Sequence, residues 1–175
     1  MELSGQEPFL ERFRAFQDEP KTQTIPFTIA IDTREQHPFD FAGHRTERAT
    51  LRTGDYSILG MEKLVCVERK SKVDLFGSVT RGRERFEREL GRMKRMPRAC
   101  IVVECSMDEV RKGIDTSKVQ PLQVINTAIA WAGRYRIPWF FLHDRAEAEQ
   151  VTLDFLRFAW RDFLERITTE EEQNR

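Results

Sequence analysis

The chain has 175 residues, which is enough for one domain that buries about 70% of the surface exposed in its unfolded form. Its 29 Lys and Arg residues balance its 29 Asp and Glu residues, which excludes an overall basic charge as the basis of function. No apolar run approaches the roughly 18 residues of a membrane span, and the N-terminus lacks the residue order of a signal peptide. We therefore expect a cytoplasmic protein without membrane contact.

Three cysteines, Cys66, Cys100 and Cys105, lie in apolar runs without the paired spacing of a zinc site. We expect them to be buried free thiols in a reducing compartment.

The N-terminal residues 1–25 predict a short amphipathic helix that docks on the core, followed by a polar linker. One domain is expected from residue 26 to residue 170. Its first part predicts strands at residues 27–32, 47–52, 55–59 and 63–70, with a polar loop at 33–45 and a hairpin loop at 60–62. His37 and His44 belong to the polar loop and lack the spacing of metal ligands.

The rest of the domain alternates helices with strands. Residues 71–79, 83–96, 107–112 and 120–135 predict helices, and the continuous apolar run at 99–104 predicts a central strand buried on both faces. Residues 137–142 predict the last strand, and residues 145–167 predict a long final helix followed by a frayed acidic tail. This order of elements indicates an α/β fold, in which helices cover the faces of one sheet.

The strand at residues 65–70 carries charges that a buried strand rarely holds. Period two places Cys66, Glu68 and Lys70 on one face of this strand and Arg69 on the opposite face. Burying a carboxylate beside an ammonium is costly unless something ionic lies between them, and a divalent cation with a phosphate would satisfy both. A surface strand with solvated charges is the alternative interpretation.

The spacing of Gly-Asp-Tyr at 54–56, Glu-Arg-Lys at 68–70 and Asp74 resembles the signature of the XPF-type structure-specific nucleases. The Asp-x-Arg-Glu sequence at 32–35 is similar to the end of that family's first strand, and Gly82-Arg83 is similar to its turn after the motif. These matches run in the family's order over residues 26–104. The resemblance implies a restriction-endonuclease-like fold, which is a mixed central sheet flanked by helices. It also implies a metal-dependent DNA endonuclease that hydrolyses phosphodiester bonds, and we expect branched or flapped DNA as the substrate.

By this resemblance, Asp32, Asp55 and Glu68 are the metal ligands, and Lys70 positions the attacking water or the scissile phosphate. Oxygen ligands of this kind suit Mg²⁺ or Mn²⁺. Arg69 and Asp74 complete the catalytic motif.

Both of these motif residues also have a structural interpretation. Arg69 points away from Glu68, so it is equally a partner for a buried carboxylate that braces the site. Asp74 is the third residue after Ser71, so it either completes a capping box or contributes negative charge near Lys70 or the metal.

Arg34, Arg81 and Arg83 are expected to contact DNA phosphates, and Arg83 is supported by the Gly-Arg match. Glu87 departs from the family pattern, since several members have Gln at that position. Eukaryotic and archaeal relatives also carry a tandem helix-hairpin-helix module after the nuclease domain, which this sequence lacks. We therefore expect either a separate DNA-binding partner that replaces the module or a simpler nuclease.

The final helix carries apolar residues around more than one face, which favours a homodimer through the C-terminal helices, with burial inside the monomer as the alternative. These residues are Val151, Leu153, Phe155, Leu156, Phe158, Ala159, Trp160, Phe163, Leu164 and Ile167.

Two other functions fit the same motif, namely a non-catalytic DNA-binding or scaffold subunit and a sequence-specific restriction-type nuclease. Degenerate family members lose the acidic and Lys positions, whereas this chain has all five of them, which favours the enzyme. They are Asp32, Asp55, Glu68, Lys70 and Asp74. Such a nuclease is expected in the cytoplasm with the nucleoid, or in the nucleus of a eukaryote.

Overall fold

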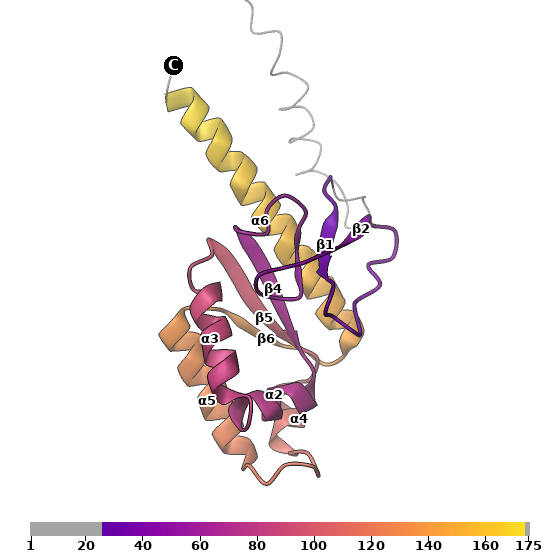
Figure 1. Ribbon diagram of the computed structural model, residues 1–175, viewed down its shortest axis with the longest axis vertical. Coiled ribbons are helices and arrows are strands. Elements are labelled where there is room, and N and C mark those ends of the chain that lie inside the picture. The colour runs from indigo at the N-terminus through magenta and orange to yellow at the C-terminus, as the bar shows by residue number, and fades with distance from the viewer. Residues whose placement is uncertain (1–25, 174–175) are drawn as a thin grey trace, which may run out of the picture.

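The computed structural model of the chain describes residues 26–173, except for the side chains at 167, 168 and 170–173. The predicted docking helix and linker at residues 1–25 lie outside the described residues. One mixed six-stranded sheet forms the centre of the fold (Figure 1). Its strands are β1 (Ile29–Asp32), β2 (Thr46–Ala49), β3 (Tyr56–Ile58), β4 (Val65–Lys70), β5 (Arg98–Val103) and β6 (Trp139–Phe141).

The strand order in the sheet is β2-β1-β3-β4-β5-β6. The strand β1 pairs in parallel with β2 and antiparallel with β3, and β3 pairs antiparallel with β4. The strands β4, β5 and β6 are parallel to one another. The predicted α/β fold with a mixed central sheet is therefore confirmed.

The helices are α2 (Lys72–Val79), α3 (Arg83–Met93), α4 (Met107–Arg111), α5 (Pro121–Tyr135) and α6 (Arg145–Gln173). The Ser71 and Ser106 side chains cap α2 and α4, and a proline begins α5, as expected where the first amides of a helix lack partners. The helix α6 continues to Gln173 because no Gly or Pro interrupts residues 168–173, so the frayed tail predicted after residue 167 is wrong.

Hydrophobic side chains fill both sides of the sheet. On one side, α6 packs against β1, β3 and alternate residues of β4 and β5, and Val67 belongs to this cluster. On the other side, α2, α3 and α5 cover a second cluster that contains Cys66. The alternation along β4 follows the predicted period of two, so Glu68 and Lys70 face the side of α2 and α3 and Arg69 faces the other side.

The helix α6 uses most of its apolar residues inside the monomer. Leu153, Leu156 and Ala159 are buried, and other apolar residues of the helix pack against the same core while partly exposed. Phe158 is 54% exposed. The apolar coverage that suggested a dimer is thus mostly explained by the monomer core, and the homodimer through α6 stays a prediction.

The cysteines Cys66, Cys100 and Cys105 are buried and free, as predicted. Burial raises the pKa of the Cys105 thiol to about 11, which keeps it protonated at neutral pH. In the described part of the chain, no helix combines the length and the apolar character that a membrane crossing requires.

Candidate active site

Three carboxylate residues of the motif lie on neighbouring segments of the sheet. Asp32 ends β1, Asp55 lies directly before β3, and Glu68 lies in β4. The Asp32 amide donates to the Asp55 carbonyl at 2.8 Å, and the Asp55 amide donates to the Val67 carbonyl at 2.8 Å. These backbone hydrogen bonds fix the position of Asp55 between the other two segments.

Gly54 allows this close approach. Its φ is +75°, and a Cβ at this position would lie 3.0 Å from the Cys66 Cβ and 3.0 Å from the Val67 carbonyl oxygen. Both the backbone conformation and the lack of space therefore require glycine. A larger residue would push Asp55 away from β4.

Glu68 and Lys70 form a buried ion pair. The Lys70 Nζ donates to Glu68 Oε1 at 2.5 Å and lies 4.3 Å from the centre of the Phe86 ring. Burial raises the pKa of Glu68 to about 6, although Lys70 acts in the opposite direction. Burial would also lower the pKa of Lys70, but Glu68 and other carboxylates raise it above its ordinary value. Lys70 is therefore a protonated ammonium held in a pocket of negative charge.

Asp55 is the second carboxylate of this pocket. Its Oδ2 accepts a hydrogen bond from the Arg69 amide at 2.8 Å. Burial raises the pKa of Asp55 well above its ordinary value, and the charge of Glu68 raises it further. A buried carboxylate whose pKa is raised by a neighbouring carboxylate favours binding of a cation beside it.

Asp32 differs because both of its oxygens are occupied by hydrogen bonds. Its Oδ1 accepts from the backbone amide and Nε of Arg34 at 2.8 and 2.7 Å, and its Oδ2 accepts from Nη2 of Arg34 at 2.9 Å and from the Leu51 amide at 2.8 Å. Burial would raise the pKa of Asp32, but these hydrogen bonds outweigh it and hold the pKa below its ordinary value.

Within residues 26–173, no group of three or more His, Cys, Asp or Glu side chains is placed to hold a metal ion. The predicted set of Asp32, Asp55 and Glu68 is therefore not assembled as a ligand cluster. Arg34 and Leu51 occupy both carboxylate oxygens of Asp32 with hydrogen bonds. The metal role of Asp32 stays a prediction that requires Arg34 to leave it.

Arg69 lies on the opposite face of β4 and braces the site. Its guanidinium donates to both Glu35 oxygens at 3.2 and 3.1 Å and to Glu104 at 2.8 Å, with all three side chains largely buried. Arg145 then donates to the other Glu104 oxygen at 2.7 Å and to the carbonyl oxygens of residues 37 and 38. This network ties the 33–45 loop to β4 and α6. The geometry supports the bracing interpretation of Arg69.

Ser71 and Asp74 form one half of the predicted capping box, because Asp74 accepts from the Ser71 hydroxyl and not from the Ser71 backbone amide. The Ser71 Oγ donates to Asp74 Oδ2 at 2.6 Å, and the Asp74 amide donates to the Ser71 Oγ at 3.1 Å. Asp74 and Lys70 also line the same groove, so the capping geometry leaves its proposed charge role open.

The three predicted DNA-contacting arginines differ in their surroundings. Arg34 is engaged with Asp32 and donates to the Leu51 carbonyl at 2.7 Å, although its side chain is 69% exposed. Arg83 lies 3.2 Å from Glu87 and 5.2 Å from the centre of the Trp131 ring. Arg81 is exposed and forms no ion pair with any residue that the structure describes. Arg81 is therefore the one of these three whose charge is most available to a ligand.

Residues 31–155 match the ERCC4 domain. The chain belongs to the ERCC4 domain family.

Solved structures share the fold of this ERCC4 domain. The XPF structure from Aeropyrum pernix has a TM-score of 0.57 and 20% identity, and the match covers 75% of this chain and 59% of that chain. The structure of Aeropyrum pernix XPF in complex with DNA has a TM-score of 0.56 and 19% identity, and the match covers 83% of this chain and 66% of that chain. No curated protein sequence matches the chain. The resemblance to the XPF-type family and the restriction-endonuclease-like fold are thereby confirmed, over less than two thirds of the length of those XPF chains.

Glu89 of the ERCC4 domain is a site residue that the sequence analysis missed. Its Oε1 lies 3.4 Å from the Thr53 hydroxyl and 3.4 Å from the Gly54 amide, and its charge contributes to the raised pKa of Glu68. Glu89 follows Phe86 by three positions in α3, and Phe86 is buried. The spacing of three residues between Glu89 and the apolar Phe86 could have identified it, because residues three apart in a helix lie on the same face.

Glu87, where the sequence departs from the family pattern, has a clear structural partner. It accepts a hydrogen bond from the Trp131 Nε1 at 3.0 Å and pairs with Arg83. Since Trp131 is a buried residue of α5, Glu87 joins α3 to α5. A glutamine could also accept the Trp131 hydrogen bond through its carbonyl oxygen.

Proposed function

We propose that this ERCC4 domain is a metal-dependent DNA endonuclease that hydrolyses phosphodiester bonds on branched or flapped DNA. The observation that carries the proposal is the buried group of Asp55, Glu68 and Lys70, in which two carboxylates share a pocket with one ammonium. This group lies within the residues that match the ERCC4 domain. Two neighbouring carboxylates can hold the metal that phosphodiester hydrolysis uses, and a lysine can stabilise the negative charge that develops on the phosphate.

The donor set fits Mg²⁺ or Mn²⁺. Both ions prefer oxygen ligands and keep several waters, so one or two carboxylates are enough. Among the described residues, no donor hydrogen-bonds to Asp55 Oδ1 or Glu68 Oε2, so both oxygens are available as ligands. When bound, the cation would offset the negative charge of the phosphate.

Lys70 is the group best placed to act on the substrate. Its ammonium is protonated, lies among carboxylates and lines the groove next to α2. A fixed cation in a site shielded from water stabilises developing negative charge on phosphate oxygens. Arg69 acts from the other face by holding β4 and the 33–45 loop in place.

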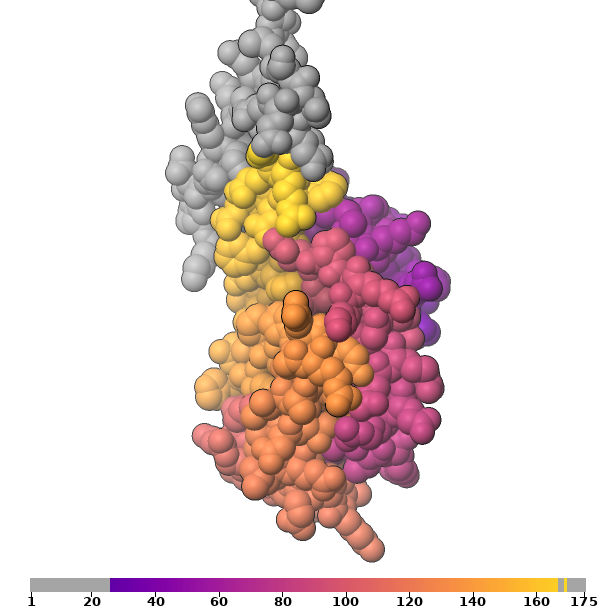
Figure 2. Space-filling model, turned by 90° about the vertical axis from the view of Figure 1, so that its left-hand side faces the viewer, coloured from indigo at the N-terminus to yellow at the C-terminus, as the bar shows by residue number. Residues whose placement is uncertain are grey.

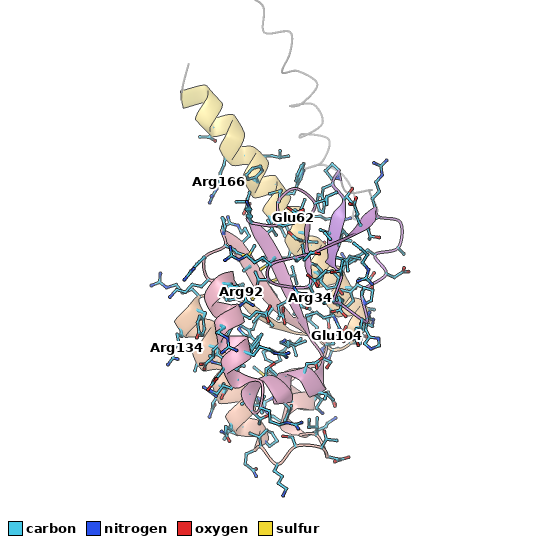
Figure 3. The ribbon with its side chains drawn as sticks, in the orientation of Figure 1. Arg34, Glu62, Arg92, Glu104, Arg134 and Arg166 are labelled. Atoms are coloured by element: carbon cyan, nitrogen blue, oxygen red, sulfur yellow. The ribbon has the colours of Figure 1, made fainter. Side chains whose placement is uncertain are left out.

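A cleavage assay on flaps, forks, junctions and plain duplex, with Mg²⁺, Mn²⁺ or EDTA, tests the proposal. We expect cleavage only with a divalent cation and mainly on branched DNA, and we expect Glu68→Gln to abolish it while the protein stays folded. Glu62→Gln is the matched control, because Glu62 lies in the loop between β3 and β4 and accepts a hydrogen bond from the Gly60 amide at 2.7 Å (Figure 3).

Three outcomes of this assay would contradict parts of the proposal. Full cleavage by Glu68→Gln would refute the metal site. Equal cleavage of plain duplex and branched DNA would refute the substrate preference and favour a restriction-type nuclease. No cleavage of any DNA by the wild-type protein would favour a non-catalytic subunit.

We also propose that the domain acts as a homodimer and that a separate DNA-binding protein adds selectivity for branches. Exposed Phe158 on α6 is a candidate dimer contact. The balanced charge of the chain supports the second point, since DNA affinity rises with the number of phosphates that cations neutralise.

A further inference from the structure

A groove of about 750 Å³ opens beside Lys70. It is bounded by α2, the turn at residues 80–82, the start of α3 and the loop before α5. Figures 1 and 2 place this loop and α4 at the end of the molecule opposite the C-terminal part of α6. The groove therefore extends from the candidate active site along one end of the molecule.

Positive charge prevails in this groove. Four cations line it, namely Lys70, Arg81, Arg85 and Lys118, against the single carboxylate of Asp74. Local excess of one charge in a concave surface concentrates the electrostatic potential there, even in a chain whose total charge is zero.

Three of the four cations of the groove differ from neighbouring cations in their pairing, whereas Lys70 pairs with Glu68. On α4 and its C-terminal end, Arg111 pairs with Asp108 and Lys112 pairs with Glu109, and Lys72 at the start of α2 also pairs with Glu109. In contrast, Arg81, Arg85 and Lys118 form no ion pair with any residue among 26–173 for which a side chain is described. Their charges are thus available to an anionic ligand.

The groove also offers apolar and hydroxyl surface. Val73 is 61% exposed, and Ile114 and Val119 line the opposite side. Hydroxyl groups of Thr116 and Ser117 lie beside them as hydrogen-bond donors and acceptors. A ligand that fits all three features has several phosphates together with exposed apolar parts.

We propose that this groove binds an unpaired DNA strand next to the phosphate that Lys70 contacts. Arg85 and Lys118 bind phosphates of the strand, and Val73 contacts a sugar or base. Unpaired strands combine accessible bases with a charged backbone, which matches the cations and the apolar surface of the groove, whereas a duplex turns its bases inward. This inference rests on the proposed function, which brings DNA to Lys70, and it identifies the single-stranded arm as the recognised part of the substrate.

Binding measurements in EDTA test the groove separately from cleavage. Fluorescence anisotropy compares a fork with a single-stranded arm and a blunt duplex of equal length, for wild type and for Arg85→Ala/Lys118→Ala. In Arg85→Ala/Lys118→Ala we expect affinity for the fork to fall about tenfold or more, and affinity for the duplex to change less than about twofold. The slope of the logarithm of fork affinity against the logarithm of salt concentration should become less steep by about 1.4. The matched control is Arg134→Ala/Arg166→Ala, which also removes two positive charges, at exposed positions of α5 and α6 away from the groove (Figure 3).

Methylphosphonates, which carry no charge, give a second readout when they replace the first linkages of the arm. They should weaken wild-type binding and leave the affinity of Arg85→Ala/Lys118→Ala nearly unchanged. Equal losses on fork and duplex, or no loss on the fork, would overturn the groove assignment. Because binding is measured without metal, an inactive protein that still shows the arm-dependent loss would refute the nuclease proposal and retain the groove.

Discussion

In the metal-free protein, Glu68→Gln should change how stability depends on pH. Burial raises the pKa of Glu68 from its ordinary value of 4.5 to about 6 in the folded protein. Between these pH values Glu68 binds more protons in the folded state than in the unfolded state, so its contribution to the wild-type free energy of unfolding falls as the pH rises. At about 1.4 kcal/mol for each pKa unit, the loss amounts to about 2 kcal/mol by neutral pH.

The Glu68→Gln variant has no proton to release at this position. Its free energy of unfolding, relative to wild type, should therefore rise by about 2 kcal/mol from about pH 4 to about pH 7. Urea unfolding in EDTA across this range measures the difference, and Glu62→Gln should give a curve parallel to that of wild type. A constant gap, or one that shrinks toward neutral pH, would refute the conclusion that burial outweighs the attraction of Lys70.

Metal addition extends the same experiment at neutral pH. A cation that binds only the folded protein stabilises it by about 2.7 kcal/mol at a free concentration one hundred times its dissociation constant. Mg²⁺ or Mn²⁺ should therefore stabilise the wild-type protein and should have little effect on Glu68→Gln. Equal stabilisation of both proteins would place the metal elsewhere.

Three further experiments each test a single feature of the structure. Asp74→Asn should lower turnover tenfold or more, which is about 1.4 kcal/mol in the barrier, whereas wild-type turnover with a lower melting temperature would limit Asp74 to capping α2. Gly54→Ala should lower the free energy of unfolding by about 2 kcal/mol or more, because the added Cβ would clash with β4. Gly60→Ala should lower it by about 1 kcal/mol, because Gly60 also has a positive φ but open space around it. Equal losses for the two variants would contradict the argument that Gly54 permits a close approach to β4. Light scattering at micromolar concentration should give the mass of two chains, and the 20.7 kDa mass of one chain would contradict the homodimer.

The sequence predicted the sheet and the site strand well because local patterns determine them. The alternation of side chains along β4 places Glu68 and Lys70 on one face of the sheet and Arg69 on the other, as the sequence predicts. The start of α2 at Lys72, directly after the N-cap Ser71, also follows from capping chemistry within four residues. These features depend on neighbours in sequence, which a single sequence shows directly.

The state of Asp32 could not be predicted in the same way. The family resemblance implies that Asp32 is a metal ligand, but its oxygens are occupied by Arg34 from the following turn and by Leu51, which is 19 residues away. Glu89 belongs to the site although the sequence analysis did not predict it. It lies 35 residues after Gly54 in the sequence and approaches Gly54 only because α3 packs on the sheet. Both contacts depend on tertiary geometry that no local pattern encodes.

Charge pairing explains why the binding surface, too, emerges only from the structure. The chain has equal numbers of positive and negative residues, so its composition predicts no basic surface. Folding joins Arg69 to Glu104, and Arg98 to Asp162 across 64 residues, which removes those cations from the set available to a ligand. Arg81, Arg85 and Lys118 have no ion-pair partner among the described side chains, and together with Lys70 they make the groove basic. A protein with zero net charge can thus present a local anion-binding surface, when ion pairs between distant residues neutralise many of its other cations.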